Sequence, residues 1–215
     1  MNIIFLGPIS CGKGTQGQIV VDKYNLVAIS IGNLLRERRK IEDEIGLKIA
    51  SLQKQGVLVD DDITLTVLEE KVKTCKENQG ILFDGYPRTI HQAHLLDELL
   101  AKYDRKIDKV INFEIDDEAV VDRIGGRLIC RCGETYHRTH KKPVNENICD
   151  KCGQDLYQRD DDTDEGIKKR LEVYHTCVVP LIDFYNNRNL LANVNALQEI
   201  EKVAKDIETI LGGKN

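Results

Sequence analysis

The segment that most constrains the fold is residues 7–15, with the sequence GPISCGKGT. It follows an apolar run at residues 2–6 and precedes apolar residues with helical spacing, so it joins a strand to a helix. Four residues separate Gly7 from Gly12 and Lys13, as in a Walker A loop, whose backbone N–H groups bind phosphate oxygens at a helix N-terminus. The strict motif has Ser or Thr directly after the lysine, whereas here Gly14 precedes Thr15. The segment therefore predicts a phosphate-binding site.

Strands and helices alternate along most of the chain. Apolar runs predict further strands at residues 26–29, 80–85, 109–115 and 190–194. Helical spacing of apolar residues predicts helices at residues 60–77, 89–103, 117–125, 163–187 and 197–211. This rhythm is typical of a doubly wound α/β fold with a parallel sheet, in which Asp84, at the end of a strand, would face the phosphate loop.

Two segments interrupt this rhythm and are interpreted as insertions. The spacing of apolar residues predicts two short helices within residues 30–59, with Ser30 as the N-cap of the first and Gly56 ending the second. Residues 127–162 have almost no apolar periodicity and cannot build a core of their own. We expect residues 1–29, 60–126 and 163–215 to form the core domain. The acidic run at residues 160–162 is interpreted as a hinge and helix cap rather than a metal site.

Composition excludes some functions. The chain of 215 residues has 31 Lys plus Arg against 36 Asp plus Glu, so its formal charge of −5 gives no general reason to expect a nucleic-acid partner. There is no signal segment and no apolar run near the roughly 18 residues of a membrane span. An odd count of seven cysteines, with no sign of secretion, favours a reduced cytosolic location.

Four of the cysteines have metal-site spacing. Cys130 and Cys132 are separated by one residue, Cys149 and Cys152 by two, and 16 residues lie between the pairs, close to the spacing of four-cysteine zinc sites. The short first pair leaves two readings: all four bind a structural zinc ion, or His137 or His140 replaces one of the first pair. The remaining interpretation is four free thiols. These alternatives stay open from the sequence.

A second motif extends the argument. Residues 84–89 read DGYPRT and are followed by Gln92 and Ala93. Together with GKGT in the phosphate loop, this string makes the chain resemble the adenylate kinase family from residue 1 to about 211. The resemblance implies a P-loop nucleoside monophosphate kinase fold, a parallel sheet flanked by helices with two inserted mobile subdomains. Residues 30–59 would be the AMP-binding insertion, and residues 127–162 the lid of the zinc-containing bacterial long form.

The resemblance also implies an activity. This is reversible transfer of the terminal phosphoryl group from MgATP to AMP, giving two ADP. The implied cofactors are magnesium with ATP and structural zinc. The partners would be ATP, AMP and ADP, with no nucleic acid or membrane, for a monomer in the cytoplasm. Such transfer needs many cations around the migrating group and exclusion of water.

By the same resemblance, individual residues acquire roles. The catalytic cations would be Lys13, Arg88, Arg123, Arg159 and Arg170. ATP would contact Ser10, Cys11, Gly12, Lys13, Gly14, Thr15, Arg123, Arg127, Thr135, Tyr136 and Ala196. AMP would contact Ile31, Arg36, Val57, Leu58, Val59, Gly85, Tyr86, Pro87, Arg88, Gln92, Arg159 and Arg170. Asp84 would hold magnesium through water, and Cys130, Cys132, Cys149 and Cys152 would bind zinc.

The chain departs from the family pattern at several site positions. Ile9 and Ser10 stand where Pro and Gly are usual, so either the stiffness of the loop changes or Ser10 takes a conformation that glycine prefers. Ile31 and Asn33 replace a threonine and an aspartate, and Ala196 replaces a glycine. The departure at Ile31 leaves open a kinase for another nucleoside monophosphate. The four-cysteine segment leaves open a second alternative, a non-enzymatic nucleotide-sensing zinc-ribbon protein.

Overall fold

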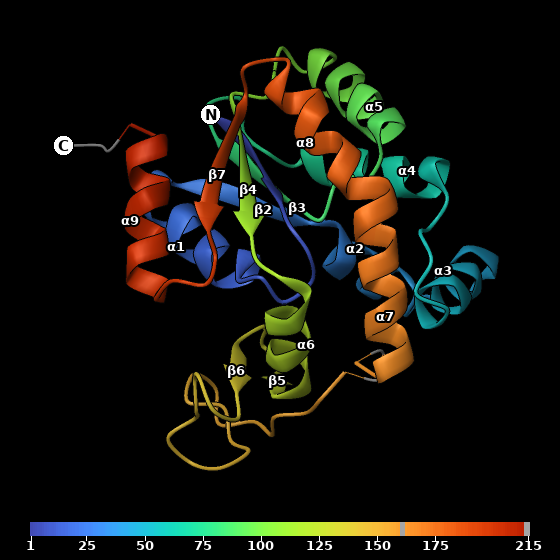
Figure 1. Cartoon of the computed structure of the whole chain (residues 1–215). Coiled ribbons are helices and arrows are strands. Elements are labelled where there is room, and N and C mark those ends of the chain that lie inside the picture. The colour runs from blue at the N-terminus through green and yellow to red at the C-terminus, as the bar shows by residue number, and fades with distance from the viewer. Residues whose placement is uncertain (160–161, 213–215) are drawn as a thin grey trace.

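The core is a parallel five-stranded sheet in the order β2-β3-β1-β4-β7. The computed structural model describes residues 1–159 and 162–212 (Figure 1). The strands are β1 (Asn2–Leu6), β2 (Leu26–Ser30), β3 (Gly80–Asp84), β4 (Lys109–Glu114) and β7 (Leu191–Asn195). The central strands β1 and β3 are almost wholly buried, as their continuous apolar runs predict. The predicted parallel α/β fold is confirmed.

Helices cover both faces of the sheet. α1 (Lys13–Tyr24) and α9 (Ile200–Ile210) pack on one face, where Val20 and Ile207 join the same buried cluster. The other face is covered by α4 (Asp61–Lys73), α5 (Ile90–Ala101) and α8 (Val179–Asn186). Local signals set the helix starts, since the side chain of Thr89 accepts a hydrogen bond from the N–H of Gln92 at the start of α5.

Both insertions lie between elements of the core. The first contains α2 (Ile31–Arg38) and α3 (Glu44–Lys54). The second begins after α6 (Asp117–Gly125), contains the antiparallel pair β5 (Arg127–Ile129) and β6 (Thr135–His137), and is followed by α7 (Asp164–Val173). Figure 1 shows α6, β5 and β6 on the side to which the arrows of β4 and β7 point. The carboxyl ends of these strands therefore face the second insertion.

The predicted helix at residues 163–187 has a different internal structure from a regular α-helix. α7 runs into a π-helical turn, η1 (Tyr174–Val178), and α8 continues from Val179. Pro180 lies in the first turn of α8, and proline has no N–H to donate to the carbonyl of Thr176 and clashes with it in a regular helix. The wider turn accommodates this lost hydrogen bond.

The part of the chain that the structure describes has no helix both long enough and apolar enough to cross a membrane.

Candidate active site and metal centre

The phosphate loop has three residues in left-handed backbone conformations. Gly7 has a φ of 142°, and a Cβ there would lie 3.1 Å from the carbonyl oxygen of Phe113 and 2.9 Å from the sulfur of Cys11. Gly12 has a φ of 105° and is the N-cap of α1. Ser10 has a φ of 58°, so the expectation that it takes a conformation favoured by glycine is confirmed. This costs a non-glycine residue about 1 kcal/mol.

The loop presents donors toward its centre. Lys13 Nζ donates to the carbonyl oxygens of Gly7, at 2.9 Å, and Pro8, at 2.6 Å, and lies 3.3 Å from Cys11 Sγ. Gly12 has no side chain to cap α1, and the first turn contains no acidic residue. The free N–H groups of that turn and the lysine therefore form a site suited to an anion.

Arg123 of α6 lies against the same loop. Its guanidinium donates to the carbonyl oxygens of Cys11, at 3.4 Å, and Ala196, at 2.8 Å. The structure therefore brings Arg123 and Ala196, two residues of the expected ATP set, to Cys11 of the phosphate loop, from which they are far apart in the sequence.

The DGYPRT segment lies beside the phosphate loop. Asp84 is the last residue of β3 and pairs with Phe5, two residues before Gly7. Arg88 Nε donates to the carbonyl oxygen of Gly85 at 2.8 Å. Burial lowers the pKa of the Arg88 guanidinium, whereas the negative charge of Asp84 opposes this shift and the positive charge of Arg170 adds to it. Asp84, Arg88 and Arg170 thus share one electrostatic environment.

Gln92 is buried, and its amide already has partners. Its Oε1 accepts from the N–H of Arg88 at 2.8 Å, and its Nε2 donates to Asp61 Oδ1 at 2.7 Å. These bonds orient the amide. An amide nitrogen has a second hydrogen and the oxygen a second lone pair, so Gln92 retains capacity to bind a nucleobase edge. Asp61 is a residue that sequence reasoning missed, because nothing in its run of aspartates singles it out.

The other expected AMP residues gather around this segment or on the first insertion. Tyr86, Pro87, Ile31 and Val59 are buried, and Val57 and Leu58 are half-buried. A Cβ on Gly85, whose φ is 74°, would lie 3.5 Å from Ile31 Cγ2, so these residues line one side of the strand end. Arg36 donates to Asn33 Oδ1 at 2.5 Å.

Asp162 joins the second insertion to α7. Its carboxylate accepts from Arg127 Nε at 3.0 Å and from Arg170 Nη2 at 2.8 Å, and its side chain is 0% exposed. Burial by itself would raise the pKa of this carboxyl, but the hydrogen bonds and charges of the two arginines hold it below its usual value. The predicted helix-capping role is wrong for Asp162, because Thr163 is the N-cap of α7. Asp160 and Asp161 lie outside the described residues.

The remaining expected ATP residues lie in the second insertion. Thr135 and Tyr136 begin β6, and the Tyr136 hydroxyl accepts from the N–H of Asp150 at 2.9 Å. The Tyr136 side chain is buried within the insertion, which leaves the backbone as the part of this residue that can reach a nucleotide. Arg159 is half-buried and lies near the end of the insertion.

The four cysteines converge on one point. Their sulfur atoms all lie within 4.8 Å of one another, with Cys130 and Cys152 sulfurs 3.3 Å apart. The short first pair therefore does not prevent both sulfurs from facing the second pair. His137 and His140 turn instead toward α6, where His140 Nε2 lies 3.1 Å from Asp122 Oδ2. Cys130 and Cys149 also form part of the small buried cluster of the insertion.

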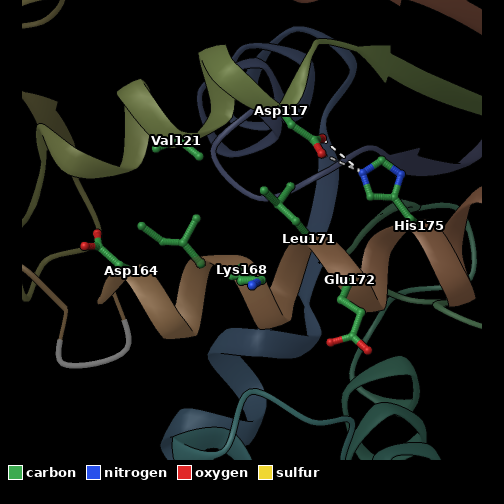
Figure 2. A pocket seen from close by; sticks show the side chains of 8 residues that line it. Asp117, Val121, Asp164, Lys168, Leu171, Glu172 and His175 are labelled. Carbon is green, nitrogen blue, oxygen red and sulfur yellow. Dashed lines mark hydrogen bonds and ion pairs between the residues drawn. The ribbon is translucent and has the colours of Figure 1, made fainter.

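Two cavities lie beside the helix that follows the insertion. One, of about 430 Å³, lies between α6 and α7 and is shown in Figure 2. The other, of about 500 Å³, lies between the ends of β4 and β7 and the segment from Tyr174 to Ile182. Neither includes a residue of the phosphate loop. The candidate active site is therefore defined by its convergent side chains and loop geometry.

Comparisons with known proteins agree with this geometry. A family model described as adenylate kinase matches residues 5–190. A protein of Bacillus subtilis named adenylate kinase is 42% identical over 214 residues, 99% of each chain. The adenylate kinases of Archaeoglobus fulgidus and Methanosarcina barkeri are 43% and 40% identical, each over 98% of both chains. Because the family model matches residues 5–190 and these relatives match nearly the whole chain, the chain belongs to the adenylate kinase family.

Proposed function

We propose that this enzyme catalyses reversible transfer of the terminal phosphoryl group from MgATP to AMP, giving two ADP. The observation that carries the proposal is the meeting of two motifs at neighbouring strand ends: the phosphate loop after β1 and the DGYPRT segment after β3. A donor and an acceptor phosphate bound at these two places would lie side by side at the carboxyl edge of a parallel sheet, where such folds bind nucleotides.

The donor nucleotide would occupy the phosphate loop. Lys13 would exchange its bonds to loop carbonyls for the outer phosphates of ATP, and the N-terminus of α1 would bind the phosphates through backbone N–H groups. Arg123 would turn from the Cys11 carbonyl to the phosphates, and the backbone near Ala196 would contact the base. The full proposed set remains residues 10–15 with Arg123, Arg127, Thr135, Tyr136 and Ala196.

The acceptor would lie between the DGYPRT segment and the first insertion. Arg88 and Arg36 would bind the AMP phosphate, and Gln92, held by Asp61, would present its amide to the adenine edge. Residues 57–59, Ile31 and residues 85–87 would surround the base and ribose. The bonds that fix Gln92 reduce the entropy lost on binding, which favours selective recognition of one base.

The transfer itself needs positioned positive charge and little covalent chemistry. Lys13, Arg88, Arg123, Arg159 and Arg170 would surround the migrating phosphoryl group. Residues 30–59 and 127–162 would close over the two nucleotides and exclude water, so that the phosphoryl group reaches AMP rather than water. Residues 1–29, 60–126 and 163–215 would be the core on which both insertions move.

Two metals would serve separate purposes. Asp84, at the carboxyl end of β3 near the phosphate loop, is suited to hold magnesium through water, and magnesium would neutralise phosphate charge. Four thiolates at about 2.3 Å from a zinc ion lie roughly 3.8 Å apart, and the observed sulfur separations of 3.3 and 3.6 Å between partners are close to that. We assign zinc a structural role, because four cysteine ligands leave no open position.

An acceptor panel tests the proposal. With ATP as donor, we expect a higher kcat/KM for AMP than for GMP, CMP or UMP, because Gln92 can both donate to and accept from adenine. Replacing the usual threonine by Ile31 removes at most one hydrogen bond, worth about 0.5–1.5 kcal/mol. A higher kcat/KM for another monophosphate would assign a different acceptor. Nucleotide binding without product from any acceptor would indicate a sensor.

We also propose that the enzyme is a cytoplasmic monomer.

A further inference from the structure

Ile9 lies inside the phosphate loop, yet its side chain points into an apolar contact. It is half-buried and packs against a buried cluster formed by Val120 and Ile124 of α6 and by Ile167 and Leu171 of α7. These two helices are the elements that lead into and out of residues 127–162. One side chain of the loop thus contacts the cluster that joins both helices.

A cavity also lies between these two helices. The cavity between them is lined by Asp117 and Val121 of α6 and by Lys168 and Leu171 of α7, as Figure 2 shows. At one end of the cavity, His175 Nε2 lies 2.9 Å from Asp117 Oδ2. Ile167 and Leu171, which line this cavity, also belong to the cluster on which Ile9 packs. The cavity also leaves room for the helices to shift relative to each other.

A second contact links the loop to α6, but we expect it to break when ATP binds. Arg123 Nη1 donates to the Cys11 carbonyl across 3.4 Å, which is long for a hydrogen bond. Arg123 is proposed to turn to the phosphates of ATP. When Arg123 has turned, the apolar contact of Ile9 with α6 and α7 would remain.

We propose that Ile9 is a positioning residue that transmits occupation of the phosphate loop to α6 and α7, and so to the insertion that they carry. The inference rests on the proposed ATP site. Ile9 anchors the loop backbone next to Ser10, which has a left-handed conformation. ATP then orders a loop that is already joined to both helices, and the helices become ordered with it.

Ile115 provides a matched control. It is also a half-buried isoleucine packed against the same cluster, but it lies outside the phosphate loop, just after β4. We compare Ile9→Ala, Ile9→Val and Ile115→Ala in the full chain, measuring ATP binding by calorimetry without AMP. We expect Ile9→Ala to weaken ATP binding by about tenfold, Ile9→Val to bind like the parent, and Ile115→Ala to lower the melting temperature with a Kd within about twofold of the parent. Parental binding by Ile9→Ala, or equal weakening by Ile115→Ala, would overturn the inference.

Hydrogen exchange separates transmission from affinity. At saturating ATP, amides of residues 117–125 and 164–173 should exchange more slowly in the parent and in Ile115→Ala. In Ile9→Ala the loop should still be protected, but this added protection of both helices should be lost. If ATP protected both helices in Ile9→Ala as strongly as in the parent, the inference about Ile9 would be refuted, but the proposed function would not. A parent that binds no ATP would refute the proposed function together with it.

Discussion

At the scale of single residues, Arg88 is a positively charged side chain whose position is fixed by its surroundings. Its guanidinium is buried enough for its pKa to fall, and Nε is held by the Gly85 carbonyl. A cation held in place contributes most where charge develops during transfer, because it needs no reorganisation. Arg88→Ala should therefore lower the kcat of ADP formation by about 10³-fold or more. Steady-state kinetics at saturating ATP and AMP, with a thermal melt of the same preparation, check this.

Arg39→Ala is the control for that variant. Arg39 is an exposed arginine that donates to Gln53 on the surface of the first insertion, so its loss should leave kcat within about twofold. If Arg88→Ala kept near-parental activity with an unchanged melting temperature, the assignment of Arg88 would be wrong.

Asp162 should matter for stability through its two arginines. Asp162→Asn leaves Arg127 and Arg170 without their buried counter-charge, a change that costs on the order of 3 kcal/mol of unfolding free energy. Asp164→Asn, at an exposed position in the first turn of α7, should cost less than about 1 kcal/mol. Denaturant unfolding at pH 7 measures the unfolding free energy of both variants. Equally small decreases in the two would contradict the role of Asp162.

The pH dependence of that difference has a definite sign. The folded-state pKa of the Asp162 carboxyl lies below its usual value of 3.8. Its stabilisation is therefore complete at neutral pH and is lost as pH falls through the folded-state pKa. The difference in unfolding free energy between the parent and Asp162→Asn should stay constant from pH 7 to about 5 and become smaller below about pH 4.

The family pattern predicted one local backbone conformation. Ser10 stands where the family usually has glycine, so a conformation favoured by glycine was one of two expectations for this position, and its φ of 58° agrees. The partners of Asp162 and Gln92 could not be predicted in this way. Gln92 and Asp61 are 31 positions apart, and Asp162 and Arg127 are 35 positions apart. No local sequence pattern encodes contacts between residues so far apart.

At the scale of elements, strands and helices were predicted from periodicity, with boundaries shifted by a few residues. The π-turn at Tyr174–Val178 was missed. Pro180 was the available signal, because it must interrupt the hydrogen-bond pattern one turn earlier. It does not specify whether a helix kinks, ends or widens, which depends on packing against the rest of the fold.

The second insertion provides the prediction at this scale. Its buried cluster has five members, two of which belong to the group of four cysteines, so the segment has little apolar stabilisation and we expect a zinc ion to stabilise it. Purified protein should contain one zinc ion per chain. Removal of zinc by a chelator, or Cys149→Ala, should lower the melting temperature far more than it lowers activity at low temperature. Metal-free protein whose melting is unaffected by a chelator would contradict a structural zinc site.

At the scale of the whole molecule, the fold places both insertions on connections between core elements, which suits hinged closure. The alternation of strands and helices predicted the core, but it carries no information on how far each insertion stands from the nucleotides. We expect a bisubstrate analogue that joins adenosine groups through phosphates to reduce the radius of gyration in small-angle scattering. Identical scattering with and without saturating analogue would argue against closure.

The central claim is that the phosphoryl group passes from ATP to AMP and not to water. The most direct measurement follows the label from ATP carrying ³²P in its terminal phosphate, with magnesium and unlabelled AMP. We predict that the label leaves ATP only when AMP is present and appears in the β-phosphate of ADP. Label released as inorganic phosphate, or ATP consumed at the same rate without AMP, would contradict the account.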